Sequence, residues 1–198
     1  MYVDQLAKII ADSHRIVFFG GAGVSTASGI PDFRSADGIF SQRLHRSVSP
    51  EELVSHTFYK KYPKEFFSFY KEKLVYPSAK PNPCHIALAQ LEKMGKVSSV
   101  ITQNIDGLHQ LAGSQTVIEL HGSIHRNYCE ACHSFHDLSY ILSAKDVPLC
   151  QQCGGNVKPD VVLYGESLNT DSMERAIHEI SHADTLIVGG TSLVVYPA

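Results

Sequence analysis

The sequence predicts an α/β protein in which a Rossmann-like, doubly wound parallel sheet carries a smaller inserted domain. Short apolar runs that read as buried strands recur at 15–19, 97–102, 116–120 and 184–192, with helical patterns between them. A glycine-rich turn follows the first run, and two closely spaced cysteine pairs interrupt the alternation late in the chain. Strands that alternate with helices form parallel sheets through right-handed crossovers, so the cysteines are expected in an insertion between two such units.

Composition narrows the class of protein. The chain has 198 residues with 17 basic and 20 acidic side chains, so its charge gives no indication of a nucleic-acid partner. No segment approaches the ~20 apolar residues that a membrane-spanning helix needs. Residues 1–13 lack the basic start and apolar core of a signal peptide and favour a short amphipathic helix. Four of the five cysteines lie in two tight pairs, unlike a secreted disulfide framework, so we expect a cytoplasmic protein.

The stretch from Phe18 to Arg34, which contains the end of the first strand and the turn after it, is the centre of the functional prediction. Three glycines in four positions let the backbone turn sharply, and the N–H groups of such a turn suit a phosphate. A glycine-rich turn that binds nothing explains the glycines equally well. The following Asp32-Phe33-Arg34 favours a nucleotide, because an aromatic face covers a planar heterocycle and a guanidinium pairs with a pyrophosphate.

The dinucleotide fingerprint of dehydrogenases does not fit this stretch. That pattern requires glycine where Thr26 stands, and an acidic residue about twenty positions later, after a second strand. Residues 39–43 contain no acid and do not resemble the end of a strand. A hydride-transfer enzyme is therefore disfavoured.

Residues 36–96 are expected to form a loop followed by helices. The loop covers 36–47, whereas Ser49-Pro50 and Asn82-Pro83 each combine a capping residue with proline at the first helical position. Aromatic residues at helical spacing after Pro63 are interpreted as core rather than as a cofactor site.

Polar residues also follow the second and third strands. Gln103, Asn104 and Asp106 offer amide and carboxylate groups for ribose hydroxyls or a carboxamide at the end where such sheets bind ligands. An Asx turn that caps the next helix is the alternative for this segment. His121 ends the third strand, where an imidazole can act as a general base near neutral pH. Because the chain has eleven histidines, only its position singles this one out.

The pairs Cys129-x-x-Cys132 and Cys150-x-x-Cys153 are separated by seventeen residues, the spacing of a four-cysteine zinc site. Four thiolates complete a tetrahedron and leave no open position, so the metal is expected to be structural. Disulfides or a chance pairing are the alternatives.

These observations divide the chain into three predicted parts. Residues 1–35, 97–122 and 160–198 form a Rossmann-like nucleotide-binding domain, 36–96 a helical insertion with a cofactor loop, and 123–159 the zinc module. The last apolar run stops abruptly, so a truncated C-terminus is expected.

Taken together, the motifs resemble those of the sirtuin family of NAD-dependent protein deacylases. The matching segments follow the family order over nearly the whole chain: Gly21-Ala22-Gly23-Val24-Ser25, Gly29-Ile30-Pro31-Asp32-Phe33-Arg34, Thr102-Gln103-Asn104-Ile105-Asp106-Gly107-Leu108-His109, His121-Gly122, the two cysteine pairs and Gly190-Thr191-Ser192. The resemblance implies a Rossmann-type large domain and a small zinc-holding domain, with NAD and acyl-lysine meeting in the cleft between them.

The resemblance also implies roles for individual residues. The implied NAD contacts are Ala22, Thr26, Phe33, Arg34, Gln103, Asn104, Ile105, Asp106, His121, Thr191 and Ser192. His121 is implied as the general base and Asn104 as the second catalytic residue. The segment Val162-Leu163-Tyr164 is implied to pair with the substrate peptide as an added strand.

The implied reaction transfers the acyl group from lysine to ADP-ribose and releases nicotinamide, with NAD as co-substrate and zinc as a structural metal. The acyl-lysine oxygen attacks the anomeric carbon, and water must be excluded from the resulting cation. The chain lacks the Tyr-x-x-Arg pattern of relatives that prefer succinyl-lysine, which favours an acetyl or longer aliphatic group. The alternatives are a protein mono-ADP-ribosyltransferase and a non-catalytic zinc-ribbon binding module.

Overall fold

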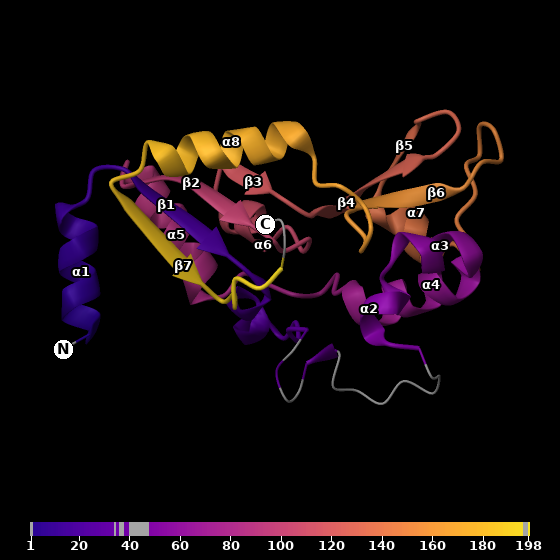
Figure 1. The fold of residues 1–198 in the computed structure, drawn as a ribbon, viewed down its shortest axis with the longest axis horizontal. Coiled ribbons are helices and arrows are strands. Elements are labelled where there is room, and N and C mark those ends of the chain that lie inside the picture. The colour runs from indigo at the N-terminus through magenta and orange to yellow at the C-terminus, as the bar shows by residue number, and fades with distance from the viewer. Residues whose placement is uncertain (1, 34, 36–37, 40–47, 196–197) are drawn as a thin grey trace.

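Two separate sheets organise the part of the chain that the computed structural model describes, residues 2–33, 35, 38–39, 48–195 and 198 (Figure 1). The larger sheet has the strand order β3-β2-β1-β7, and all of its neighbouring strands are parallel. Its strands are β1 (Ile16–Gly20), β2 (Val97–Thr102), β3 (Val117–Glu119) and β7 (Thr185–Gly189). Each strand lies within a residue or two of an expected apolar run, so the predicted parallel sheet is confirmed.

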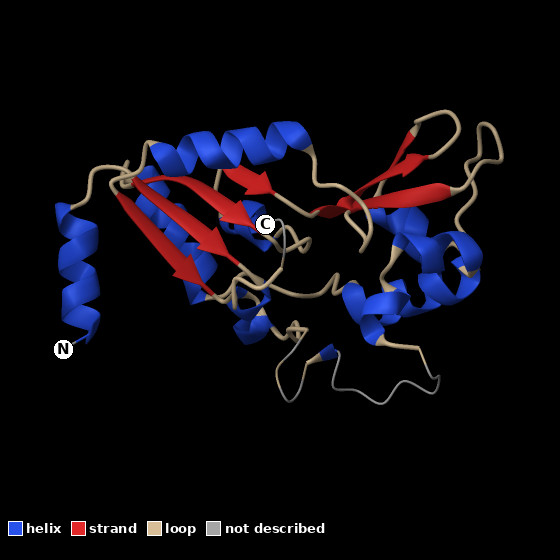
Figure 2. Ribbon diagram, viewed as in Figure 1, coloured by secondary structure: helices blue, strands red, loops and turns tan. Residues whose placement is uncertain are grey.

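Helices cover both faces of the larger sheet, as a doubly wound fold requires (Figures 1 and 2). On one face, Leu88 of α5 (Pro83–Lys93) packs with buried residues of β1 and β2. On the other face, Ala176 of α8 (Thr170–Ser181) packs with a second buried cluster from β1, β2 and β3. The short α6 (Leu108–Ala112) lies beside α5. β1 contributes to both clusters, and its five residues are all buried.

The expected N-terminal helix is present as α1 (Tyr2–Asp12), at one side of the larger sheet (Figure 1). None of its residues is buried, and Leu6 and Ile9 remain 46% and 49% exposed. Within the described ranges, no helix combines the length and apolar character needed to cross a membrane.

The smaller sheet is antiparallel, with the strand order β5-β4-β6. Its strands are β4 (Gly122–Cys129), β5 (Phe135–His136) and β6 (Val157–Val161), and α7 (Leu138–Ser143) lies next to β4. Because β4 starts directly after His121, the end of the larger sheet continues straight into the smaller one.

Further helices pack beside the smaller sheet: α2 (Pro50–Leu53), α3 (His56–Lys61), α4 (Pro63–Phe69) and the π-helical turn η4 (Tyr70–Leu74). The predicted start at Ser49-Pro50 is confirmed, because the Ser49 side chain accepts a hydrogen bond from Glu52 N at 3.2 Å. The loop expected over 36–47 falls mostly outside the described residues; Ile39 within it is buried.

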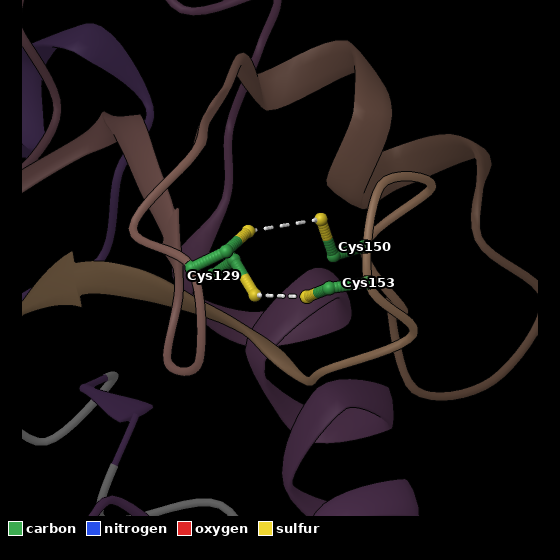
Figure 3. Close-up of side chains that lie close together, drawn as sticks. Cys129, Cys150 and Cys153 are labelled. Atoms are coloured by element: carbon green, nitrogen blue, oxygen red, sulfur yellow. Dashed lines mark hydrogen bonds between the residues drawn. The ribbon is translucent and has the colours of Figure 1, made fainter.

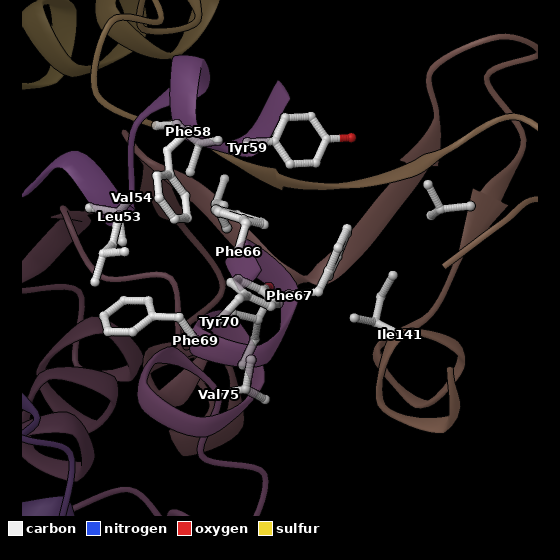
Figure 4. Packing of buried hydrophobic residues seen from close by; sticks show 14 of the residues in the cluster. Leu53, Val54, Phe58, Tyr59, Phe66, Phe67, Phe69, Tyr70, Val75 and Ile141 are labelled. Atoms are coloured by element: carbon white, nitrogen blue, oxygen red, sulfur yellow. The ribbon is translucent and has the colours of Figure 1, made fainter. Parts of the chain in front are cut away.

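One core joins these helices to the smaller sheet (Figure 4). Phe66, Phe67 and Tyr70 are almost completely buried in it, which confirms that the aromatics after Pro63 are structural. Ile141 of α7 and Val157 of β6 belong to the same cluster. Of the helices in residues 36–96, α2 to η4 therefore share the core of the smaller sheet, whereas α5 covers the larger one.

Candidate active site

Three loops meet where the strands of the larger sheet end. The first follows β1 and contains the short helices η1 (Ala22–Val24) and η2 (Thr26–Ser28). The second, residues 103–107, follows β2, and the third, residues 190–192, follows β7. Because these strands are neighbours and parallel, their carboxyl ends lie at one edge, where open α/β sheets bind ligands.

The glycine loop lies directly against the loop after β7. Gly21 N donates to Gly189 O at 3.1 Å, and Gly23 N donates to Gly190 O at 2.8 Å. A Cβ atom at Gly23 would lie 2.8 Å from the Gly190 Cα, closer than atoms in contact can approach. Glycine at this position is therefore required by packing between two loops, which explains part of the motif without a ligand.

Ser25 connects the glycine loop to the loop after β2. Its hydroxyl donates to Asp106 Oδ2 at 2.6 Å and accepts from Asn104 Nδ2 at 3.0 Å. Ser25 is 1% exposed, so water does not compete for these bonds. The side chains of Asn104 and Asp106 are thus held in fixed positions relative to the glycine loop.

Asp106 also forms the helix-capping turn that was the alternative prediction for this segment. Its Oδ1 accepts from Leu108 N at 2.9 Å at the start of α6. Both carboxylate oxygens are therefore engaged within the protein, one by a backbone N–H and one by Ser25.

Gln103 joins all three loops. Its N–H donates to Gly20 O at 2.9 Å, and its Oε1 accepts from Thr191 Oγ1 at 3.4 Å. Its Nε2 atom is buried and has no hydrogen-bond partner among the described residues. A buried N–H without a partner is costly, so this amide is suited to a polar group of a ligand.

His121 adjoins the same loop. Its Nδ1 lies 2.9 Å from the Gln103 carbonyl oxygen, which fixes Nδ1 as the protonated nitrogen and leaves the lone pair on Nε2. Burial lowers the pKa of His121 below its usual 6.5, and the bond to Gln103 opposes that shift only in part. The imidazole is therefore neutral near pH 7, as a general base must be.

The remaining predicted contacts lie on the same loops or beside them. Phe33 and Ile105 both pack against the aromatic core of the helices and the smaller sheet, whereas Arg34 lies outside the described residues. Ala22 is half-buried, Thr26 is exposed and donates to Gly23 O at 3.0 Å, and Ser192 is exposed.

The segment Val162-Leu163-Tyr164 leaves β6 next to the site, because Val162 N donates to His121 O at 3.0 Å. The Leu163 N–H donates to Glu166 Oε2, and the Leu163 carbonyl oxygen accepts from Glu166 N, so both main-chain groups of Leu163 are engaged. The Tyr164 main chain pairs with residues 54 and 56 around a parallel bridge to Ser55. A peptide strand added here has to use the remaining main-chain groups of the segment or displace that bridge.

The four cysteines come together as the sequence predicts (Figure 3). Their sulfur atoms all lie within 4.8 Å of one another, with Cys129–Cys153 at 3.4 Å and Cys132–Cys150 at 3.6 Å. A disulfide requires about 2.05 Å, so these distances exclude one. Sulfurs at 2.3 Å from a tetrahedral zinc would be about 3.8 Å apart, which the cluster fits closely.

Backbone geometry supports the same assignment. The N–H groups of Ala131, Gln152 and Gly155 each point at a cysteine sulfur at 3.4 Å, as in a zinc knuckle. A Cβ at Gly155 would lie 3.0 Å from the Cys129 sulfur, so the turn leaves no room for a side chain there. The residues present therefore fit a structural zinc ion.

Sequence reasoning missed two residues that hold the loops. Asn82, expected only as a helix cap, also donates from Nδ2 to Val24 O at 2.8 Å and to Ser28 Oγ at 3.0 Å. The Nε2 of His125, in β4, lies 3.2 Å from Asp106 O. The His125 ring also packs against Gly107, where a Cβ atom would lie 2.8 Å from the ring. A capping signal gives no indication of contacts to a loop 54 residues earlier, and nothing in the pattern marks His125.

Comparison with known proteins gives a consistent answer. A family model described as the Sir2 family matches residues 21–197. The chain is 63% identical over 196 residues to a Clostridium perfringens protein named NAD-dependent protein deacetylase, covering 99% of this chain and 80% of that one. A Staphylococcus aureus protein with the same name is 47% identical, with 99% and 80% coverage.

Solved structures agree in fold. A complex of Sir2 with a deacetylated peptide and 3′-O-acetyl-ADP-ribose has a TM-score of 0.90 and 41% identity, covering 100% of this chain and 79% of that chain. A Sir2 complex with a peptide and NAD⁺ has a TM-score of 0.86 and 42% identity, with the same coverage.

Proposed function

The chain belongs to the Sir2 family, and we propose that it is an NAD-dependent protein-lysine deacetylase. The observation that carries the proposal is the convergence of the glycine loop, Gln103 and the His121 imidazole at one edge of the sheet. Relatives named for this activity cover the chain almost completely, and solved Sir2 structures with peptide and NAD⁺ share its fold.

NAD is assigned to the edge where the three loops meet. The glycine loop, with Ala22 and Thr26, faces the phosphates, and Thr191 and Ser192 help to hold the nucleotide. Phe33 and Ile105 provide the apolar side of the nicotinamide pocket, with Asp106 at the carboxamide and Arg34 toward the phosphate and ribose. The unpartnered Nε2 of Gln103 supports this assignment, because a ribose hydroxyl would satisfy it.

His121 acts as the general base. When bound, NAD supplies an anomeric carbon with nicotinamide as the leaving group, and the acyl-lysine carbonyl oxygen is the nucleophile. The Nε2 lone pair of His121 then removes a ribose hydroxyl proton, so that this oxygen can take the acyl group. Asn104, fixed by Ser25, orients the ribose, which matters because a well-placed reactant lowers the barrier without new chemistry.

The acyl-lysine peptide binds along Val162-Leu163-Tyr164. Two observations support this proposal: Val162 N donates to the carbonyl oxygen of His121, the proposed base, and the Tyr164 side chain is 42% exposed. The peptide would pair with the main-chain groups that the segment's own bonds leave over, or would displace the bridge between Tyr164 and Ser55. Main-chain pairing binds a peptide regardless of its sequence, so the enzyme would accept different protein substrates.

Zinc is held by Cys129, Cys132, Cys150 and Cys153 and contributes to folding rather than to the reaction, because four thiolates leave no open position. Thiolate ligands need a reducing compartment, which supports a cytoplasmic location. The nearly balanced charge supports protein substrates without a direct nucleic-acid partner.

The proposal is tested by incubating the zinc-loaded chain with NAD and an acetyl-lysine peptide and analysing the products by mass spectrometry. Loss of the acetyl group with formation of O-acetyl-ADP-ribose supports deacetylation. A peptide that instead gains ADP-ribose would establish a mono-ADP-ribosyltransferase, and an unchanged peptide with salt-sensitive DNA binding a zinc-ribbon binding module. A panel of longer acyl chains then defines the acyl preference.

A further inference from the structure

Two exposed histidines lie one above the other near the end of α8, far in sequence from the cysteine cluster. His178 lies in the last turn of the helix, and His182 is its C-terminal cap, four residues later. Their ring centroids are 4.3 Å apart with the planes tilted by 34°. Residues at this spacing share one helix face, so both imidazoles project to the same side.

The hydrogen bonds of His182 leave it ready to bind a metal. Its Nδ1 lies 2.8 Å from the His178 carbonyl oxygen, so Nδ1 carries the proton and Nε2 keeps its lone pair. Histidines that bind metals commonly donate their second ring N–H to a carbonyl or carboxylate in this way, because that bond fixes the tautomer and the ring orientation. The Nδ1 of His178 lies 3.7 Å from Glu179 Oε1, which is within ion-pair range but too long for a hydrogen bond.

Both imidazoles are exposed, so an ion can reach them from solvent. His178 also lines a shallow surface cavity of about 270 Å³ between α8 and β3, together with Thr116, Ile118, Glu174, Arg175 and Glu179, whereas His182 lies outside this cavity. Glu179 is already paired with Arg15 at 2.9 Å, so its carboxylate is not needed as a ligand for the metal ion. The two imidazoles decide which metal binds, because nitrogen donors favour Cu²⁺, Ni²⁺ and Zn²⁺ over Mg²⁺ or Ca²⁺.

We propose that His178 and His182 form a second metal site, which binds one transition-metal ion between their Nε2 atoms, with water in the remaining positions. Two histidines four residues apart on a helix provide the nitrogens of known zinc centres, which shows that the spacing allows chelation. The site differs from the cysteine cluster in donor type and exposure. It binds metal reversibly, whereas four thiolates retain zinc.

The site is tested on the zinc-loaded chain by calorimetric titration with Ni²⁺ at about pH 7.5, because a histidine must be unprotonated to bind a metal. One Ni²⁺ per chain is expected to bind in addition to the zinc. His178→Gln and His182→Gln should each weaken this binding by more than about tenfold, because losing a ligand costs at least as much as losing its hydrogen-bond partner. With Cu²⁺ as the probe, the electron paramagnetic resonance spectrum should show two nitrogen ligands.

His14→Gln is the matched control, since His14 is exposed but has no histidine one helical turn away. It should leave the nickel affinity within about twofold of the unmodified chain. The proposal is overturned if no Ni²⁺ binds beyond the zinc, or if either single variant keeps the affinity. Nickel that enters only by displacing zinc would also overturn it. All three substituted positions are exposed, so the variants should fold, which circular dichroism checks.

Discussion

The position of His121 depends on a main-chain group rather than on another side chain. The Gln103 carbonyl oxygen, 2.9 Å from Nδ1, selects the tautomer with a free Nε2. The backbone of the loop after β2 therefore orients the imidazole that is proposed as the base, and a ligand that moved this loop would also move His121.

His121→Ala is expected to lower turnover by about 10²- to 10⁴-fold, the usual contribution of a general base, while NAD still binds. Turnover and NAD affinity are measured separately, by product formation and by calorimetry. In the unmodified enzyme, the rate should fall with decreasing pH only below 6.5, because the lowered pKa of His121 keeps the base unprotonated above that value. Full turnover in the His121→Ala variant would show that His121 is not the general base.

A second pair of histidines is buried beneath the loops. His85 and His109 are almost completely inaccessible, and their ring centroids are 4.6 Å apart. Burial, with His85 nearby, lowers the pKa of His109 to about 4, and burial also lowers the pKa of His85. Both ring nitrogens of His109 lack a hydrogen-bond partner within the described part of the chain, so the environment disfavours a charge there.

Acid should therefore destabilise the fold. The unfolded chain takes up a proton at His109 near pH 6.5, whereas the folded chain does so only near pH 4. The free energy of unfolding should fall as the pH decreases between these values, by on the order of 3 kcal/mol from this residue. His109→Gln should flatten the dependence of the unfolding midpoint on pH. An equally steep dependence in His109→Gln would contradict this explanation.

The sequence predicted which residues gather at the site better than what each one contacts. Asp106 and Gln103 were expected at the ligand, and both lie on the expected loop. Their bonds to Ser25 and Thr191 depend on the distance between two strands, which no local pattern reports. The sequence analysis treated a capping turn and a ligand contact as alternative roles for Asp106. In the structure, the Asp106 carboxylate forms the capping turn.

At the scale of secondary structure, the start of α5 has a role beyond helix formation. Asn82 caps the helix by accepting from Cys84 N at 2.9 Å, while its Nδ2 holds Val24 and Ser28 of the glycine loop. The Asn-Pro signal predicted where the helix begins. It could not predict the second set of bonds, because these depend on how α5 packs against β1 and β2.

Asn82→Ser separates these two roles. Serine is a good helix cap but is too short to reach Val24, so the glycine loop should loosen while α5 persists. Two lost hydrogen bonds of about 1 kcal/mol each should weaken NAD binding by about tenfold or more, measured by calorimetry. Asn169→Ser is the matched control, because Asn169 caps α8 through Ser172 N at 2.9 Å. Equal NAD affinity in both variants would show that the Asn82 amide does not position the loop.

At the scale of the whole molecule, the sequence predicted the parallel sheet and the zinc module inserted into it, but not that the module is built on an antiparallel sheet. Periodicity and cysteine spacing carry that information locally. The shared aromatic core between α2–η4 and the smaller sheet was not predicted, because it joins residues that are about 70 positions apart. The boundaries at 36, 97, 123 and 160 remain predictions.

This shared core couples the zinc module to the proposed peptide segment. Glu130, within the first cysteine pair, accepts from Tyr59 Oη at 2.9 Å and pairs with Lys60 at 2.6 Å. Both partners belong to α3, whose first residue, His56, bonds to the Tyr164 carbonyl. Cys129 and Cys150 are themselves part of the core, so losing the metal should disturb the helices as well as the knuckle.

Zinc removal should therefore affect the peptide more than NAD. Cys129→Ser, or treatment with a chelator, is expected to lower the unfolding midpoint by more than about 5 °C, because a structural zinc site contributes folding energy directly. The KM for acetyl peptide should rise more than the KM for NAD, since α3 supports Tyr164 while the glycine loop is built on the larger sheet. Cys84→Ser, at the cysteine outside the cluster, should change none of these values. A zinc-free chain with an unchanged midpoint, or with both KM values raised equally, would mean that the metal does not act through the core it shares with α3.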